Sequence, residues 1–351
     1  MSRGPGDGWQ PGHVRVEHEV LRRAGRGGSR VVPFVAWPLV VLAVATVLLR
    51  LAGAAGQSYL ALALGLLPLS LLPCYPILVA AAFTRRRGLA VVSLALVVAH
   101  LVFIWPAIRP APDVGALARG APTLTVLSFN TAGDKVDAAA LYRLIERERP
   151  DVVALLELSP RTAAALDKAG LAATYPHRLV KPADKALAGA GLYSRIPIED
   201  ASLLPTVTSV MPGATVRVGG IAVRVQAVHA APPMGGLVGR WQAEHLALAT
   251  LARKSGEALV LAGDFNSGRQ HPVWRALADA GLTDAHEARA RGIVRTWPDD
   301  RALLPALLDL DHVMVSRQLV VVAVSERSGL GSDHKALVTE LAVTSADAAR
   351  P

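Results

Sequence analysis

The stretch VLAGDFNSG, residues 260–268, says more about the fold than any other part of the chain. An apolar run typical of a buried strand stops at Gly263, and Asp264 and Asn266 follow one residue apart. Taken alone, these residues are explained by a polar turn, because Asp, Asn, Ser and Gly are ordinary turn formers. If the strand continues, side chains 264 and 266 point to the same face and can reach one target. The rest of the chain must decide between a turn and a functional site.

Charge is distributed unevenly along the 351 residues, of which 52% are hydrophobic and which carry a formal net charge of +9. Residues 1–120 hold 12 Lys and Arg against 4 Asp and Glu, a net of +8. Residues 121–351 hold 25 against 24, a net of +1. The C-terminal part therefore lacks the broad basic excess typical of proteins that bind duplex nucleic acid. Cys74 is the single cysteine, so an intrachain disulfide is excluded.

Three apolar stretches, at about 31–55, 59–83 and 89–108, are each long enough for a membrane span of roughly 20 residues. Arginines cluster before the first stretch and between the second and third: Arg3, Arg15, Arg22, Arg23, Arg26 and Arg30, then Arg85, Arg86 and Arg87. Because basic segments stay in the cytoplasm, three spans place everything after Ile108 outside it. A cleaved signal peptide fits poorly, since two further apolar stretches follow the first.

The sequence predicts five segments. They are a disordered, basic cytoplasmic tail (1–30), a three-span transmembrane module (31–108), a linker (109–122), a catalytic domain (123–345) and a C-terminal tail (346–351).

Within residues 123–345, short apolar runs alternate with amphipathic helices. Strands are predicted at 124–129, 151–158, 189–195, 258–265, 311–316, 319–326 and 335–343, and a hairpin at 214–230 around Gly219 and Gly220. Helices are predicted at 137–150, from 161, at 239–256 and at 272–281. We interpret this as an α+β fold, a four-layer α/β sandwich of two packed mixed sheets flanked by helices, preceded by three transmembrane helices.

Polar side chains stand where these strands begin or end: Asn130, Glu157, His229, Asp264 with Asn266, Asp311 with His312, and Asp333 with His334. Active sites of layered α/β folds collect at strand ends, because there the chain leaves the core and polar groups converge. Repetition at six places favours a functional site over six unrelated turns.

The motifs SFN, LLE, AVH, GDFN, LDH and GSDH, in this order, resemble the endonuclease/exonuclease/phosphatase superfamily over about residues 122–345. The resemblance implies a hydrolase of phosphoester bonds that uses a divalent cation, Mg²⁺ or Mn²⁺. It implies metal binding by Asn130, Glu157 and Asp333. It implies catalytic roles for His229, Asp264, Asn266, Asp311 and His334. Asp264 would orient or deprotonate water, Asn266 would stabilise the pentavalent phosphorus, and Asp311 would pair with His334.

One departure concerns the metal-binding Glu of that family, which usually follows Gln, whereas Leu156 precedes Glu157 here. Trp297 could stack on substrate and Arg195 could contact phosphate, so both are candidate substrate-binding residues; core packing and solvated surface are the alternatives for them. His312 is expected to be structural.

We therefore expect a membrane-anchored, metal-dependent phosphodiesterase, multi-pass in the cell membrane with its catalytic domain outside the cytoplasm. Its partners would be the lipid bilayer and a phosphoester substrate, either a phospholipid head group or nucleic acid, and no protein partner is inferred. Two alternatives stay open: an extracytoplasmic nuclease on DNA or RNA, and a catalytically silent, membrane-tethered binding module.

Overall fold

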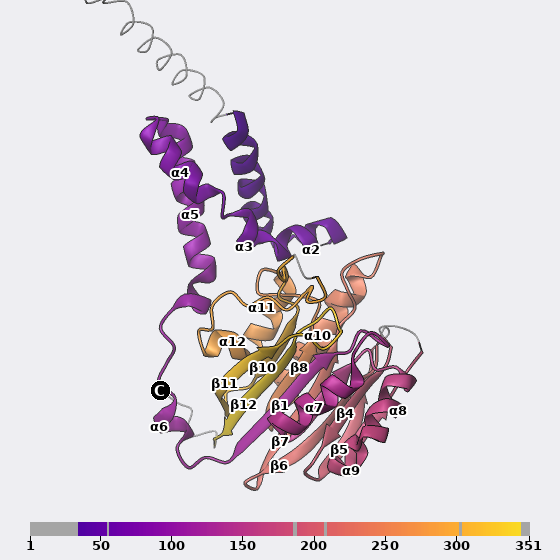
Figure 1. Cartoon of the computed structure of the whole chain (residues 1–351). Helices are drawn as coiled ribbons and strands as arrows, with labels where there is room; N and C mark the ends of the chain where they lie inside the picture. Colours follow the sequence, from indigo (N-terminus) through magenta and orange to yellow (C-terminus); the bar gives the residue numbers. More distant parts are fainter. Residues whose placement is uncertain (1–33, 55, 185–187, 207–208, 302–303, 345–351) are drawn as a thin grey trace, which may run out of the picture. The chain divides into compact units, whose positions relative to one another are not determined.

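The computed structural model describes residues 34–54, 56–184, 188–206, 209–301 and 304–344 (Figure 1). The predicted tails, 1–30 and 346–351, lie outside these residues. Contacts divide the chain into two compact units. The first comprises residues 1–47 and 68–102, and the second residues 48–67 and 103–351.

Apolar helices make up the described residues of the N-terminal third of the chain, of which residues 48–67 and 103–108 belong to the second unit. Two helices are long and apolar enough to cross a membrane, Phe34–Leu51 and α5 (Arg87–Ile108). The predicted second span is broken: α2 (Ser58–Gly65) ends before α3 (Leu67–Ser70) and α4 (Cys74–Phe83). Proline lacks the amide hydrogen that an α-helix needs and clashes with the preceding turn, so Pro68 and Pro73 explain these breaks. Instead of three uninterrupted candidate spans, the described residues contain two, or three if the broken segment crosses as one.

The second unit contains two six-stranded mixed sheets. One sheet has the order β11-β12-β1-β2-β4-β3 and the other β5-β6-β7-β8-β10-β9. Strands of the first sheet are β1 (Thr123–Asn130), β2 (Val152–Leu156), β3 (His177–Lys181), β4 (Ala190–Ser194), β11 (Leu319–Arg327) and β12 (Ala336–Val343). Strands of the second are β5 (Ile198–Leu204), β6 (Met211–Val218), β7 (Ile221–His229), β8 (Ala258–Asp264), β9 (Thr283–Asp284) and β10 (Asp311–Val315).

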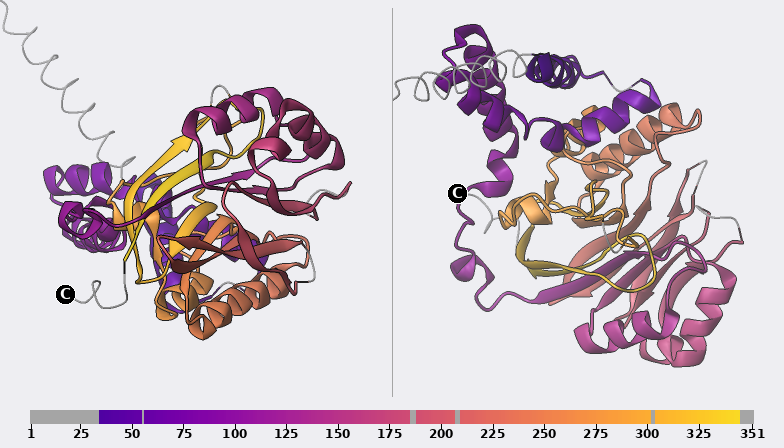
Figure 2. Two further views of the ribbon diagram at one scale, coloured as in Figure 1. Left: turned by 90° about the horizontal axis from the view of Figure 1, so that it is seen from below. Right: turned by 45° about the horizontal axis from the view of Figure 1, so that its top comes forward.

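Helices cover the outer faces of both sheets, which gives the four layers (Figure 2, left). On the first sheet lie α7 (Ala138–Glu148), α8 (Pro160–Ala169) and α9 (Leu171–Thr174). On the second lie α10 (Val238–Lys254) and α11 (Pro272–Asp279). The short helices α6 (Gly115–Ala118) and α12 (Ala285–Ala288) also belong to this unit, and so does α2. Aliphatic side chains from both sheets form one core between them, and each helical layer closes a further core.

Local sequence explains the element ends. Asp137 caps α7 by accepting hydrogen bonds from the backbone N–H groups of Ala139 and Ala140. Ser159 caps α8 in the same way, with Pro160 at its first position. Gly219 and Gly220 both have positive φ, 57° and 85°, at the tip of the β6–β7 hairpin, as the two-residue turn predicted there requires.

Strand directions carry the polar strand ends to one edge. β1 and β2 are parallel, and so are β7 and β8, so each pair finishes at the same side of its sheet. His229 is the register partner of Asp264 in the parallel pair. Asp311, the first residue of antiparallel β10, is the register partner of Asp264 on the other side. The topology therefore places three candidate residues side by side before any side chain is considered.

Candidate active site

Asp264 and Asn266 meet through a turn and not through strand alternation. β8 ends at Asp264, and Asn266 adopts the left-handed conformation, with φ 47°. The Asn266 backbone N–H donates to Asp264 Oδ1 at 2.8 Å, and its side-chain Nδ2 donates to the carbonyl of Ala230 at 2.9 Å. Our expectation of continued strand alternation is therefore wrong, because an Asx turn ends the strand. The two side chains nonetheless line one pocket.

Gly263 is required by close packing at this strand end. A Cβ at this position would overlap the carbonyl oxygen of Val228 on neighbouring β7. The glycine thus lets β7 and β8 approach closely enough to put His229 and Asp264 in register.

Asn130 connects the two sheets inside the site. It is the last residue of β1 and fully buried. Its Nδ2 donates to Glu157 Oε1 at 3.1 Å and to Asp264 Oδ2 at 3.0 Å, and its Oδ1 accepts from the N–H of Ala132 at 3.0 Å. Glu157 directly follows β2 with φ 48°, which turns its side chain toward Asn130. One amide therefore holds a carboxylate from each sheet.

His229 stands beside both carboxylates. Its Nε2 lies 3.5 Å from Glu157 Oε1 and 4.0 Å from Asp264 Oδ2, and its side chain is 1% exposed. His334 lies near the same oxygen of Asp264, with its Nε2 3.8 Å from Oδ2. The Nδ1 of His334 donates to Asp311 Oδ2 at 2.9 Å. Asp264 is thus flanked by two imidazoles, one of which is held by a second carboxylate.

Burial shifts the protonation equilibria of these groups. Burial raises the pKa of Glu157, against the hydrogen bond from Asn130. Burial also raises the pKa of Asp264 to about 6, although the neighbouring histidines oppose the shift. For His334, burial alone would lower the pKa, but the carboxylates of Asp311 and Asp264 raise it to about 10. At neutral pH the site therefore holds an imidazolium next to a carboxylate whose proton affinity is matched to that pH.

Two hydroxyl groups that the sequence analysis did not identify position the His334–Asp311 pair. Thr296 Oγ1, fully buried, accepts from the backbone N–H groups of Leu310 and Asp311, both at 3.1 Å. Ser332 Oγ donates to the carbonyl of Asn130 at 2.7 Å and accepts from the N–H of His334 at 3.1 Å. Thr296 precedes Trp297 in the RTWP stretch, and Ser332 belongs to GSDH. The signals were that Ser332 lies inside a motif already quoted and that Thr296 directly precedes Trp297, a candidate substrate-binding residue.

Trp297 and Asp333 line the same pocket as Asp264 and His334. Trp297 Nε1 donates to Asp333 Oδ2 at 3.2 Å, and Lys135 Nζ lies 3.9 Å from the same oxygen. Asp333 therefore belongs to the rim of the site.

Arg195 is placed elsewhere, which corrects our assignment of it to substrate binding. It directly follows β4, and β4 runs antiparallel to β2 with Ser194 opposite Val152, at the far end of β2 from Glu157. Its guanidinium donates to the carbonyl of Arg149 and to Asp151 Oδ1, at 2.6 and 2.8 Å. Arg195 therefore stabilises the sheet at the end of the strands opposite to the site.

Comparison with known proteins places these residues in a family. Residues 127–334 match the Endonuclease/Exonuclease/phosphatase family, more than half of the chain. The chain belongs to the endonuclease/exonuclease/phosphatase family. It is accordingly a hydrolase that acts on phosphoester bonds. A search of curated proteins found no match.

Solved structures agree with the fold of this family. TDP2 of D. rerio in complex with a single-strand DNA product aligns with a TM-score of 0.52 at 16% identity, over 62% of this chain and 98% of that one. A functionally unknown protein from Enterococcus faecalis V583 aligns with a TM-score of 0.53 at 14% identity, over 63% and 100%. A family protein from Bacteroides vulgatus aligns with a TM-score of 0.52 at 18% identity, over 63% and 99%. At these identities the likeness concerns the fold.

Enzymes of this family generally need a divalent metal ion, and two groups of side chains are candidates for holding it. One oxygen or nitrogen atom from each of Asp264, Asp311 and His334 lies within 4.8 Å of the others. As placed, however, His334 uses its Nδ1–H to donate to Asp311 Oδ2 and has its Nε2 3.8 Å from Asp264 Oδ2, so the ring serves these carboxylates. Glu157 fits better, since a cation would compensate the desolvated carboxylate whose pKa burial has raised. Asn130, as placed, uses its NH₂ group to bridge the carboxylates, which makes it a positioning residue for Glu157.

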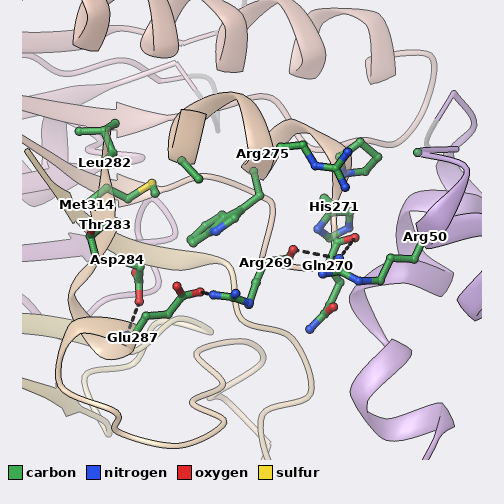
Figure 3. Close-up of a pocket in the computed structure, with 14 residues that line it drawn as sticks. Arg50, Arg269, Gln270, His271, Arg275, Leu282, Thr283, Asp284, Glu287 and Met314 are labelled. Atoms are coloured by element: carbon green, nitrogen blue, oxygen red, sulfur yellow. Dashed lines mark hydrogen bonds and ion pairs between the residues drawn. The ribbon is translucent and has the colours of Figure 1, made fainter. Parts of the chain in front are cut away.

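A second pocket adjoins the loop that carries Asn266 (Figure 3). Arg50 Nη1 donates to the carbonyls of Arg269 and Gln270, at 3.2 and 3.0 Å, and Arg269 pairs with Glu287. The lining residues include none of the catalytic carboxylates. Arg50 lies near the end of the first apolar stretch of the sequence, and its hydrogen bonds hold the loop after β8.

Two buried histidines form hydrogen bonds with the same loop, which follows β8. His245 Nε2 lies 2.8 Å from Ser267 Oγ, and His312 Nε2 lies 2.9 Å from the carbonyl of Ser267. His312 Nδ1 lies 3.1 Å from Asp284 Oδ2. His312 therefore faces away from Asp311 and supports the loop, as a structural residue would.

Proposed function

We propose that this protein is a membrane-anchored, divalent-cation-dependent phosphodiesterase whose catalytic domain lies outside the cytoplasm. The bridge from Asn130 to both Glu157 and Asp264 is the observation that carries the proposal. It brings the carboxylates of two sheets together in one pocket, beside His334 and its partner Asp311.

Asp264 serves as the base in this mechanism. Water attacks phosphorus, the bond between phosphorus and the leaving oxygen breaks, and Asp264 accepts the proton of the water. A pKa of about 6 suits this task, because a base works best near the operating pH. Asn266, fixed by its bond to the carbonyl of Ala230, stabilises the equatorial oxygens of the phosphorus.

The two histidines stabilise the negative charge that develops on the phosphate and leaving-group oxygens during cleavage. His229 donates a proton to a phosphate oxygen or to the leaving oxygen. His334 stays an imidazolium held by Asp311 and stabilises negative charge electrostatically. Glu157, positioned by Asn130 and joined by Asp333 at the rim, would hold Mg²⁺ or Mn²⁺. When bound, such a cation neutralises charge on the phosphate oxygens.

The apolar helices and the arginines support the proposed anchoring with the catalytic domain outside the cytoplasm. The helices Phe34–Leu51 and α5 meet the length and composition of spans. Arg85 and Arg86 lie between α4 and α5, and Arg87 is the first residue of α5; Lys and Arg near span ends favour the cytoplasmic side. Proteolysis of intact cells tests the orientation: the domain after Ile108 should be cut, and full protection would contradict it.

A nuclease is the second candidate. The similar structure of D. rerio TDP2 holds a single-strand DNA product, which favours nucleic acid for that protein. Against it here stands the charge of residues 121–351, 25 Lys and Arg against 24 Asp and Glu. A silent binding module is disfavoured, because such a module has no need for Glu157, Asp264 and His334 in one pocket.

The direct test uses the full chain in lipid nanodiscs with bis(4-nitrophenyl) phosphate. Hydrolysis should require Mg²⁺ or Mn²⁺, stop with EDTA, and fall at least a hundredfold in Asp264→Asn, as expected for loss of a general base. Asp279→Asn, at the end of α11, makes the same change outside the pocket and should keep wild-type rates. Equal rates for all three proteins would favour the silent module.

A further inference from the structure

One wall of the catalytic pocket comes from the apolar N-terminal sequence. The pocket has a cavity of about 390 Å³ and holds Glu157, Asp264, Asn266 and His334 on one side. Helix α2 supplies another side through Ser58, Ala61, Leu62 and Gly65. The second unit includes residues 48–67, so this segment folds with the catalytic domain although the sequence reads it as the start of a membrane span.

Specific contacts hold α2 in place. His271 Nε2 donates to the carbonyl of Ala61 at 2.9 Å, while its Nδ1 accepts from the N–H of Gly268 at 2.9 Å. Burial lowers the pKa of His271, which keeps the ring neutral, as this pair of bonds requires. Leu64 of the same helix is fully buried in the core that contains Trp241 and Phe265. The wall is therefore attached to the loop after β8 on one side and to the core on another.

Gly65 allows α2 to approach this closely. A Cβ there would stand 3.1 Å from Leu308 Cδ2, which is tighter than ordinary contact, and 3.5 Å from His271 Cε1, which is ordinary contact. Leu308 lines the pocket as well.

The remaining wall is apolar too. Pro232, Pro233 and Met234 follow β7 and its His229, and Trp297 and Leu310 face the same space. Met234 is 62% exposed and Leu62 54% exposed, so large apolar side chains stand open to the cavity. Besides the catalytic groups, the lining contains the polar residues Ser58, Lys135, His271 and Asp333, and the rest of it is apolar.

The apolar part of the pocket lining determines which substituent on the phosphate binds well. A phosphate that reaches Asp264 and Glu157 places the group esterified to it against α2 or the Pro232–Met234 segment. Burying a sugar or a base there without hydrogen bonds is unfavourable. Burying an alkyl chain is favourable by about 0.8 kcal/mol for each methylene, roughly fourfold in binding.

We infer that the substrate is a phosphodiester with an alkyl or acyl chain, a phospholipid, and that α2 forms the binding site of its chain near the head group. The inference rests on the proposed phosphodiesterase activity and names the substrate class of that same site. It also gives α2 a function that a simple anchor would not need.

A homologous series of alkyl 4-nitrophenyl phosphates, methyl to hexyl, tests the inference on the full chain in nanodiscs with Mg²⁺. The kcat/KM should rise by two- to fourfold for each added methylene, because a fully buried methylene contributes about fourfold. In Leu62→Gln the gain in ln(kcat/KM) for each methylene should fall to less than half of its wild-type value, whatever the rate on the methyl ester. Leu246→Gln is the matched control, since Leu246 is 57% exposed on α10 and outside the pocket.

The comparison between variants removes the effect of substrate partitioning into the bilayer, which is the same for all three proteins. A rise with chain length that is identical in Leu62→Gln and wild type would overturn the inference and leave the phosphodiesterase intact. So would faster cleavage of a single-stranded oligonucleotide than of the hexyl ester. Failure to hydrolyse even the methyl ester would overturn the proposed function itself.

Discussion

Replacing Asp311 by Asn tests the pairing on which the catalytic arrangement depends. The change keeps size and shape but removes the charge that His334 Nδ1 contacts at 2.9 Å. Side-chain exposure of the pair is 8% for His334 and 2% for Asp311, so water cannot substitute for the lost carboxylate. Thr296 would still fix the backbone at position 311, which confines the perturbation to the side chain.

The magnitude follows from the type of bond lost. A hydrogen bond to a charged group contributes about 1.5–3 kcal/mol. Since each 1.36 kcal/mol is about tenfold in rate, kcat/KM should fall by roughly 10- to 150-fold. Asp311 also contributes most to the raised pKa of His334 against its burial, so the variant weakens the imidazolium that stabilises the phosphate.

The assay is hydrolysis of bis(4-nitrophenyl) phosphate by the full chain in nanodiscs, with kcat and KM measured separately. Asp309→Asn is the control, because the Oδ1 of Asp309 lies 3.8 Å from His312 Nε2 and its side chain does not line the catalytic pocket. It should retain activity within about threefold. If Asp311→Asn stays within twofold of wild type and keeps its thermal midpoint, the His334–Asp311 pair has no catalytic role and our assignment of it fails.

Three further predictions concern stability and the opposite edge of the sheet. Leu341→Ala, in the fully buried core between the sheets, should lower the free energy of unfolding by about 2–5 kcal/mol in denaturant titrations, and a loss below 1 kcal/mol would contradict the packing described. For His312, burial alone would lower the pKa, but Asp309 and Asp284 raise it to about 10 from an unfolded value of 6.5. Its stabilisation is therefore complete below pH 6.5 and is lost as the pH rises through 10, so the gap in thermal midpoint between wild type and His312→Gln should narrow between pH 7 and pH 10; a constant gap would show that the charge plays no part. Arg195→Gln should leave kcat/KM within twofold, because its partners lie at the far edge from Glu157, and a tenfold loss would restore it to the site.

The strands that form the site could be predicted because their residues are buried on both faces. β1, β2 and β8 read as short apolar runs in the sequence, and each ends at or next to a polar side chain of the pocket. By contrast, β3 and β5 were missed, since they are edge strands with polar, largely exposed residues and weak alternation. Periodicity reports burial, so it fails where a strand is paired on one side and solvated.

Arg195 was misplaced because the sequence does not give strand direction. β4 lies next to β2, but it runs antiparallel, so its end lies away from Glu157. Asn266 was assigned to the right pocket for a wrong reason, since side-chain hydrogen bonding of Asp264 ends the strand before alternation can act.

The role of α2 could not be read from sequence, because an apolar helix looks the same whether lipid or protein covers it. Hydrophobicity is non-directional and contains no information about the partner surface. Gly65 and Pro68 were the local signs that the predicted second span is interrupted.

The bond from His271 to the carbonyl of Ala61 has a practical consequence for anyone who trims this protein to a soluble fragment. A fragment that begins at residue 109 would lack α2, so the imidazole would lose its acceptor and the hydrocarbon side of the cleft would be replaced by bulk water. The catalytic pocket of such a fragment would lack the side that α2 forms. The fragment's activity on short esters would then make the enzyme look less selective for the substituent on the phosphate than the intact protein is.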